Sequence, residues 1–191
     1  MRTIVFATAN PNKVREVGAS LGPGFRILSL PDIGCTEEIA ETGLTLEENA
    51  LIKARYVKQH FGYDCFSEDT GLEIQALDGA PGVYTARFAG PECTPEDNIN
   101  LTLKKMQGMT TRAARFRTII ALISGGQETL FEGIINGRIA TEPSGSGGFG
   151  YDPIFIPEGH FTTFAEMPLE AKKNISHRGR AVAKLMDFLK I

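Results

Sequence analysis

The chain has 191 residues, of which 42% are hydrophobic and 23% are charged, and its formal net charge is −3 at pH 7. This length can bury one sizeable core, and the composition is that of a globular protein, which excludes a disordered or fibrous chain. The slight negative charge excludes the broad basic field of a nucleic-acid groove, so any phosphate must be bound by a few placed cations.

Two further features bear on where the protein works. The start of the chain, Met1–Phe6, is a short strand-like run rather than a signal sequence, and no apolar stretch approaches the length of a bilayer span. Cys35, Cys65 and Cys93 are widely spaced and form no C-x-x-C, which argues against a disulfide framework or a zinc site. We therefore expect a soluble, cytoplasmic protein with no membrane or nucleic-acid partner.

The first part of the chain alternates strand and helix patterns. Residues 3–7 are predicted to form a buried strand, and a turn at 10–12 precedes apolar residues at helical spacing up to Leu21. This pattern predicts a first βα unit. A second strand is predicted at 26–30, followed by an acidic and polar loop at 32–42.

The segment after this loop has the signals of a helix start. Thr45 is a good N-cap residue, and Glu47 and Glu48 place negative charge in the first turn. Apolar residues recur at helical spacing after it. They predict a helix that runs to about His60.

The remainder of the chain is meander-like. Strands are predicted at 64–67 and 72–77, and Thr94 is expected to cap a helix at 95–106. The last predicted elements are strands at 115–124 and 128–134 joined by a Gly125-Gly126 hairpin turn, a strand at 154–156, and a helix at 177–189.

Early strand and helix alternation followed by a meander predicts an α/β (mixed α+β) protein in which residues 1–191 form one domain. We expect an elongated mixed central sheet flanked by helices, and two lobes with the active site in the cleft between them. The glycine- and proline-rich stretches at 79–95 and 144–150 are candidates for the place where the lobes meet.

The most informative segment is the glycine-rich run at 144–153. Residues 145–150 match the G-x-G-x-x-G pattern, but a proline-bracketed strand-like run follows instead of a helix, so a dinucleotide fingerprint is excluded. The glycines are expected to let main chain approach a flat, polar ligand, with Phe149 or Tyr151 as a stacking face. The alternative is an ordinary flexible turn.

Two other segments carry polar residues suited to a phosphate or a metal ion. Residues 8–13 lie where a first strand ends and a helix begins, which favours a phosphate with Lys13 as its cation; helix capping by Asn10 with a solvated Lys13 is the alternative. Glu68 and Asp69 at a strand end suit Mg²⁺, and neighbouring strand residues point to opposite faces, so one of the two is expected to face any given cleft. The alternative is a pair of surface carboxylates.

Cations and a histidine stand before the last helix, at 171–179, a place suited to an anion or to a polar base edge. The alternative is that Ser176 caps the helix while His177 and Arg178 are merely exposed.

Together these segments resemble, from end to end, the inosine triphosphate pyrophosphatases, also described as non-canonical purine nucleoside triphosphate pyrophosphatases. The matching segments, which are highly specific as an ordered set, are 8–13 with Glu16, 41–50 with Lys53 and Ala54, 69–72, 79–87, 147–153 and 176–179.

The resemblance implies a role for each matching residue. The phosphates would be held by Thr8, Ala9, Asn10, Pro11, Asn12 and Lys13. Asp69, placed like the family's catalytic carboxylate, would bind Mg²⁺ or serve as base for the attacking water. The nucleotide pocket would comprise Phe149, Gly150, Tyr151 and Asp152. Thr70 and Lys172 would contact the substrate, and His177 with Arg178 would read the base edge that carries a 6-oxo group.

The implied reaction is Mg²⁺-dependent hydrolysis of ITP, dITP or XTP between the α- and β-phosphates, and similar proteins are homodimers. Two positions depart from the family's pattern. Many members carry a glutamate doublet where Ala40 precedes Glu41, so we choose Glu41 over Glu38 as the second metal ligand. Members commonly have Asp where Glu68 stands, and the longer side chain is expected to alter the metal's geometry slightly.

Overall fold

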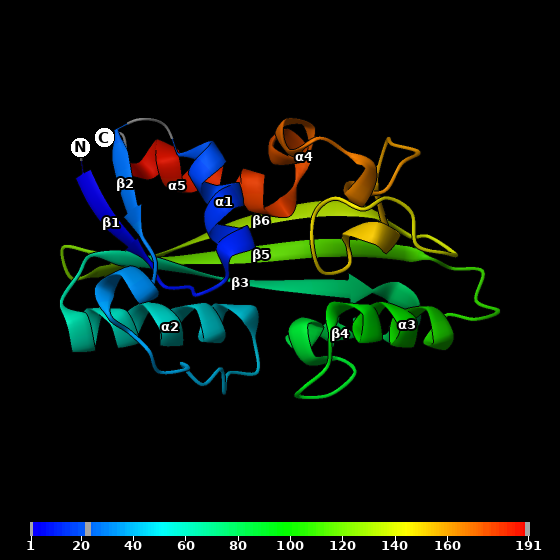
Figure 1. The fold of residues 1–191 in the computed structure, drawn as a ribbon, viewed down its shortest axis with the longest axis horizontal. Coiled ribbons are helices and arrows are strands. Elements are labelled where there is room, and N and C mark those ends of the chain that lie inside the picture. The colour runs from blue at the N-terminus through cyan, green and yellow to red at the C-terminus, as the bar shows by residue number, and fades with distance from the viewer. Residues whose placement is uncertain (1, 22–23, 190–191) are drawn as a thin grey trace. The chain divides into compact units, whose positions relative to one another are not determined.

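The computed structural model describes residues 2–21 and 24–189, which form a mixed sheet with helices on its faces (Figure 1). The strands are β1 (Arg2–Phe6), β2 (Phe25–Leu28), β3 (Cys65–Ile74), β4 (Pro81–Gly82), β5 (Ala113–Ser124), β6 (Gln127–Ile139) and β7 (Phe155–Pro157). The α-helices are α1 (Pro11–Ser20), α2 (Leu46–Phe61), α3 (Pro95–Lys105), α4 (Leu169–Ile175) and α5 (His177–Leu189).

The sheet is mixed, as predicted. Its strand order is β2-β1-β3-β5-β6-β7, and β4 pairs with β3. β1 runs parallel to both β2 and β3, whereas β7 is antiparallel to β6 and β4 to β3. None of the helices in the described ranges has both the length and the apolar character needed to cross a membrane.

The chain divides into two compact units, each built from separate stretches of sequence. The first unit comprises the described residues of Met1–Asp69, Thr118–Gly133 and His177–Ile191, and the second comprises Thr70–Arg117 and Ile134–Ser176. This division agrees with the predicted two lobes. Because β3, β5 and β6 each contribute residues to both, neither unit is a continuous segment of the chain.

In the first unit, α1 and α5 cover one face of the strands and α2 covers the other (Figure 1). The core on the α1 and α5 side includes Phe6 and Phe66, whose rings stack with centroids 4.5 Å apart. Gly133 of β6 packs against the start of α5, where an added Cβ would lie 2.0 Å from the carbonyl oxygen of His177. A side chain at Gly133 would therefore displace the first turn of α5.

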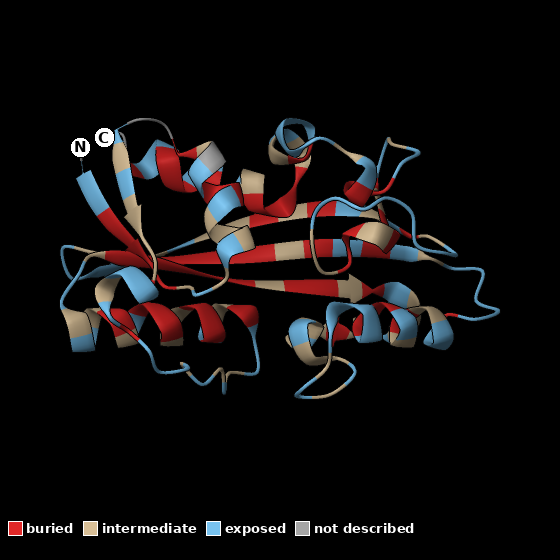
Figure 2. Cartoon of the chain, in the orientation of Figure 1, coloured by how far each residue is buried: buried red, intermediate tan, exposed pale blue. Residues whose placement is uncertain are grey.

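α2 begins as the sequence predicts. The Thr45 hydroxyl accepts from the Glu48 N–H, and the Glu48 carboxylate accepts from the Thr45 N–H, which is a capping box. The buried face of this helix, which Figure 2 shows as a red stripe, includes Ala50, Ala54 and Val57. The capping box fixes the position of the segment that enters α2.

The second unit has its own core, formed by apolar residues of the strands, α3 and the segment around β7. Phe116, Phe155 and Phe164 pack at its centre, with the rings of Phe116 and Phe155 4.6 Å apart. α3 has a capping box in which Thr94 and Asp97 bond each other's backbone N–H groups. The predicted N-cap Thr94 is confirmed.

Several local predictions differ from the structure, among them the strand predicted at 26–30, which runs over Phe25–Leu28. β3 is one continuous strand rather than two, because Gly71 is buried within the sheet, and 75–77 form a 3-10 turn. β6 extends to Ile139, beyond the predicted end at 134. A 3-10 turn at Asp152–Ile154 delays β7 by one residue, and α4 was not predicted because this short helix has only a few apolar residues.

Candidate active site

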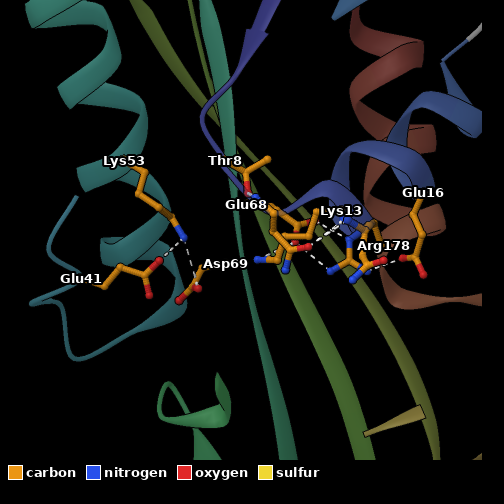
Figure 3. A network of polar contacts seen from close by, with 10 residues as sticks. Thr8, Lys13, Glu16, Glu41, Lys53, Glu68, Asp69 and Arg178 are labelled. Atoms are coloured by element: carbon orange, nitrogen blue, oxygen red, sulfur yellow. Dashed lines mark hydrogen bonds and ion pairs between the residues drawn. The ribbon is translucent and has the colours of Figure 1, made fainter. Parts of the chain in front are cut away.

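The two carboxylates of β3 point to opposite faces of the strand, as the alternation of strand side chains requires (Figure 3). Both are buried, with Glu68 2% and Asp69 7% exposed, so the alternative of surface carboxylates is wrong. Cys65 and Ser67 bond backbone carbonyls of α2, which places Asp69 on the α2 face as well. Glu68 faces the side of α1 and α5.

On the α2 face, Lys53 lies between two carboxylates. Its Nζ is 2.5 Å from Oε1 of Glu41 and 3.4 Å from Oδ1 of Asp69 (Figure 3). Burial raises the pKa of Asp69 above its ordinary value; the charge of Lys53 opposes this shift and the charge of Glu41 adds to it. Burial lowers the pKa of Lys53, but the charges of Asp69 and Glu41 outweigh it, so that pKa is raised.

The donor set on this face fits a magnesium ion. Oδ2 of Asp69 is buried and has no hydrogen-bond partner among the residues that the structure describes. Glu41 shares Lys53 with Asp69, whereas Glu38 is exposed, and the choice of Glu41 as the second metal ligand stays a prediction. The described residues contain no group of three or more His, Cys, Asp or Glu side chains arranged for a metal. Two carboxylates completed by phosphate and water are the ligands that Mg²⁺ prefers.

On the opposite face, Glu68 joins cations from two helices. Its Oε1 is 3.0 Å from Nζ of Lys13, and its two oxygens accept from Nε and Nη2 of Arg178 at 2.7 and 2.8 Å. Glu16 accepts from Nη1 of the same guanidinium. Burial raises the pKa of Glu68, but Arg178 and Lys13 outweigh it and hold that pKa well below its usual range.

The ion pairs of Glu68 bear on whether Lys13 and Arg178 are solvated, which was the alternative interpretation of the sequence. Lys13 is paired with a buried carboxylate, so it is not simply solvated. His177 and Arg178 are each 3% exposed, so the alternative of two exposed side chains is wrong. Three guanidinium nitrogens of Arg178 donate to carboxylates of its own unit, and its predicted contact with a base edge stays a prediction.

The predicted phosphate segment forms the start of α1. Asn10 is the N-cap residue, and its Oδ1 accepts from the N–H groups of Asn12 and Lys13 at 2.9 and 3.4 Å. The Thr8 hydroxyl accepts from the N–H of Asn10. Helix capping by Asn10 is therefore confirmed, and Pro11 takes the first helical position, where no N–H is needed. Ala9 is exposed.

In the second unit the glycine-rich run closes on its own chain. The N–H of Gly147 donates to the carbonyl of Ala165 at 2.9 Å. A Cβ on Gly148 would lie 2.0 Å from Oδ2 of Asp152, and the φ of +69° at Gly148 itself favours glycine. The close approach that the glycines allow is thus, in part, to the protein's own carboxylate and backbone.

That carboxylate anchors a buried ion pair. Oδ2 of Asp152 accepts from Nζ of Lys172 at 2.6 Å and from the N–H of Phe149 at 2.8 Å. Nζ of Lys172 lies over the Phe149 ring, 5.1 Å from its centroid. Tyr151 is a core residue whose hydroxyl donates to the carbonyl of Thr85. Of the two stacking candidates, only Phe149 keeps an exposed part.

The remaining predicted positions are less constrained. Thr70 follows Asp69 in β3 and is half-buried. Gly150 has a φ of +61° and open space where a Cβ would stand. A hollow of about 530 Å³ in the second unit, beside the Arg115–Glu73 ion pair, includes none of the predicted site residues in its lining. The predicted site residues with charged side chains therefore lie in the clusters around Asp69, Glu68 and Asp152, and not along this hollow.

Three residues of the first-unit clusters received no role from the sequence. Lys53 and Glu16 belong to the segments that match the family, and this match was the signal available in the sequence. Asn49 is fully buried on α2. A buried polar residue cannot be told from an exposed one by spacing alone.

Known proteins resemble this chain over nearly its whole length. The model of the Ham1 family matches residues 4–188. A dITP/XTP pyrophosphatase of Christiangramia forsetii is 53% identical over 186 residues, covering 97% of this chain and 98% of its own, and one from Porphyromonas gingivalis is 50% identical over 190 residues, covering 99% and 98%. The structure of a HAM1 protein from Coxiella burnetii has a TM-score of 0.91 at 36% identity, covering 100% of this chain and 99% of that one. The chain belongs to the Ham1 family, and it is a nucleotide-hydrolysing enzyme.

Proposed function

We propose that this enzyme hydrolyses ITP, dITP and XTP to the nucleoside monophosphate and pyrophosphate, with Mg²⁺ as cofactor, and so removes these nucleotides from the cell's pool. The proposal is supported by the relatives' names together with one observation, the cluster in which the buried Asp69 and Lys53 meet the half-buried Glu41. A carboxylate with a raised pKa and an unpartnered oxygen is suited to bind a metal or accept a proton.

The residues of the first unit divide the phosphate chemistry among them. Glu41 and Asp69 would hold the Mg²⁺, which supplies charge neutralisation at the phosphate oxygens when bound. Asp69 orients the attacking water and accepts its proton. Lys13 offers a positive charge to the phosphates, and the N–H groups at the start of α1 add the positive end of the helix dipole. Glu68 holds Lys13 in place until substrate arrives.

For the base, the proposal assigns the second unit's Phe149 as the stacking face, beside the buried pair of Lys172 and Asp152. Arg178 and His177 are proposed to read the 6-oxo group. A donor that faces a 6-oxo group would be left unpaired opposite the amino group of adenine, at a cost of about 1–3 kcal/mol. We further propose that the enzyme is cytoplasmic and that it is a homodimer. Size-exclusion chromatography with light scattering tests the homodimer directly.

Product analysis tests the function. The protein is incubated with ITP, XTP, dTTP and ATP, with and without Mg²⁺, and monophosphate, diphosphate and pyrophosphate are separated. We expect monophosphate and pyrophosphate from ITP and XTP only when Mg²⁺ is present. Equal turnover of ATP or dTTP would indicate a pyrophosphatase for other nucleotides, and binding without products a non-catalytic module. Diphosphate as the product would exclude cleavage at the α–β bond.

A further inference from the structure

Asn49 connects the loop that carries Glu41 to helix α2. It stands four residues after the N-cap Thr45 and is fully buried. Its Oδ1 accepts from the backbone N–H of Gly43 at 2.8 Å. An amide whose oxygen accepts from the loop presents its nitrogen, a donor, on its other side.

The loop can reach Asn49 only because residue 43 is glycine. A Cβ there would lie 2.6 Å from Cβ of Glu48 and 2.7 Å from Oδ1 of Asn49. Any side chain would push the loop off the first turn of α2 and move Glu41 with it. Gly43 and Asn49 therefore set the position of one proposed metal ligand.

The nitrogen side of the amide concerns the other proposed ligand. Nδ2 of Asn49 and Oδ2 of Asp69 are both buried, and each has no hydrogen-bond partner within the described part of the chain. One atom is a donor and the other an acceptor. Cys65 and Ser67 bond the carbonyls of Ala54 and Ala50, so each step of two residues along β3 moves about one turn toward the start of α2. Asp69, two residues further along the same face of β3, therefore lies opposite the turn of α2 that carries Asn49.

A second helix in the same protein shows what a purely structural asparagine looks like. Asn98 stands four residues after the capping-box Thr94 of α3 and is also buried. Its Oδ1 accepts from the loop N–H of Ala89 at 2.8 Å, as Asn49 does from Gly43. Its nitrogen, however, donates to the carbonyl of Ala86 at 3.2 Å. Both asparagines anchor a loop, but the nitrogen of Asn98 has a backbone partner, whereas that of Asn49 has none among the described residues.

We propose that Asn49 is a positioning residue, which ties the Glu41 loop to α2 through its oxygen and orients the Asp69 carboxylate through its amide nitrogen. Groups that hold a ligating or catalytic carboxylate fix the direction of its lone pairs, and their loss typically costs 10–100-fold in activity or metal affinity. This role rests on the proposed function, since it acts through Asp69.

The contact itself is tested without any activity. In ¹⁵N-labelled protein, the side-chain NH₂ resonances of Asn49 and Asn98 are compared between wild type and Asp69→Ala. We expect the Asn49 signal to move and the Asn98 signal to stay. An unmoved Asn49 signal overturns the proposal, whether or not the enzyme hydrolyses ITP.

Kinetics and metal binding test the consequence. For Asn49→Ala we expect kcat with XTP to fall at least about tenfold with KM changed less than about twofold, and the Kd for Mn²⁺, measured by calorimetry, to rise about tenfold. The matched control Asn98→Ala should lose thermal stability but keep kcat and the Mn²⁺ affinity. Equal kcat and Mn²⁺ affinity in the two variants would make Asn49 a loop anchor only and overturn the proposal.

A third variant separates the two ends of the amide. Asn49→Asp keeps the volume and the oxygen that accepts from Gly43, but it removes the donor toward Asp69. We expect its kcat to fall at least as far as that of Asn49→Ala. Wild-type kcat in Asn49→Asp contradicts the proposal, and this variant decides the matter if Asn49→Ala does not fold. Failure of the wild type itself to hydrolyse any triphosphate would count against the proposed function instead, and the resonance test would still stand.

Discussion

The two units each bury an aspartate beside a lysine, and the two pairs differ in how completely the carboxylate is satisfied. In the second unit, one oxygen of Asp152 accepts from both Lys172 and a backbone N–H, at 2.6 and 2.8 Å. In the first unit, Lys53 is 3.4 Å from Asp69 and closer to Glu41, and the second oxygen of Asp69 has no partner in the described residues.

This contrast indicates which of the two carboxylates is available for chemistry. A carboxylate that receives short, charge-assisted hydrogen bonds stabilises the fold and is poorly available for other partners. A buried carboxylate with a distant, shared cation has a raised pKa and a free energy cost that a metal ion or a proton would relieve. The environment of Asp152 therefore suits a structural anchor, and that of Asp69 suits a group that binds a metal or accepts a proton.

The largest effect should come from Asp69→Asn. We expect kcat with XTP to fall on the order of 10³-fold, because the amide can neither accept the proton of water nor bind a metal as a carboxylate does. Thermal stability at pH 7 should be equal to or above that of wild type, since the raised pKa means that the ionised carboxylate costs folding energy. Near-normal turnover, or a marked loss of melting temperature, would break the comparison.

Asp152→Asn should show the opposite pattern. It leaves the Lys172 ammonium buried without its charge partner, and losing one member of such a pair costs about 3–5 kcal/mol. Denaturant unfolding measures the loss. The control is Asp64→Asn, which breaks the half-exposed pair with Lys58 and should cost about 1 kcal/mol or less. Equal losses in the two variants would contradict the assignment of Asp152 as a buried anchor.

Glu68, the neighbour of Asp69 on β3, should make the stability of the fold sensitive to acid. Because the folded-state pKa of Glu68 is lowered, Glu68 contributes stability at pH values above its unfolded-state pKa, and this contribution is lost as pH falls toward the folded-state value. We expect the free energy of unfolding to decrease below about pH 4.3, the ordinary glutamate range, and to decrease less steeply in Glu68→Gln. Parallel pH profiles for the two proteins would show that the ion pairs of Glu68 are not what acid breaks.

The smallest effect expected is the metal response of a Lys53 variant. Lys53→Met leaves Glu41 and Asp69 facing each other without their shared cation, so we expect a lower melting temperature in the absence of metal. Added Mn²⁺ should raise that temperature by more than it does in wild type, because removal of the competing ammonium should tighten metal binding, and a ligand that binds the folded state more tightly stabilises it more. The matched control is Lys58→Met on the same helix, whose Mn²⁺ response should equal that of wild type; equal responses in all three proteins would count against a metal at this pair.

Prediction from sequence succeeded where local physical chemistry decides the outcome. The capping residues Thr45 and Thr94 and the apolar spacing of the last helix placed three helices close to their observed bounds. It was wrong where burial overrides local preference. Two separate strands were predicted at 64–67 and 72–77, yet the sheet carries β3 through Gly71 without a break. Phe149 and Tyr151 were alternative candidates for a stacking face, and only the structure shows that the Tyr151 ring packs in the core of the second unit.

The order of residue types along the chain was enough to identify the family, to place a carboxylate pair on a strand with its members facing apart, and to predict a cation beside the first helix. Those features follow from periodicity and from short-range backbone bonding. Which cation meets which carboxylate was decided only in three dimensions, because Glu16, Glu68 and Arg178 lie far apart along the chain and depend on packed helices and strands to meet. The strength of an interaction between charges, and the pKa of each group, depend on how much water surrounds them. Because burial is a property of the folded molecule, only the tertiary structure could decide these quantities.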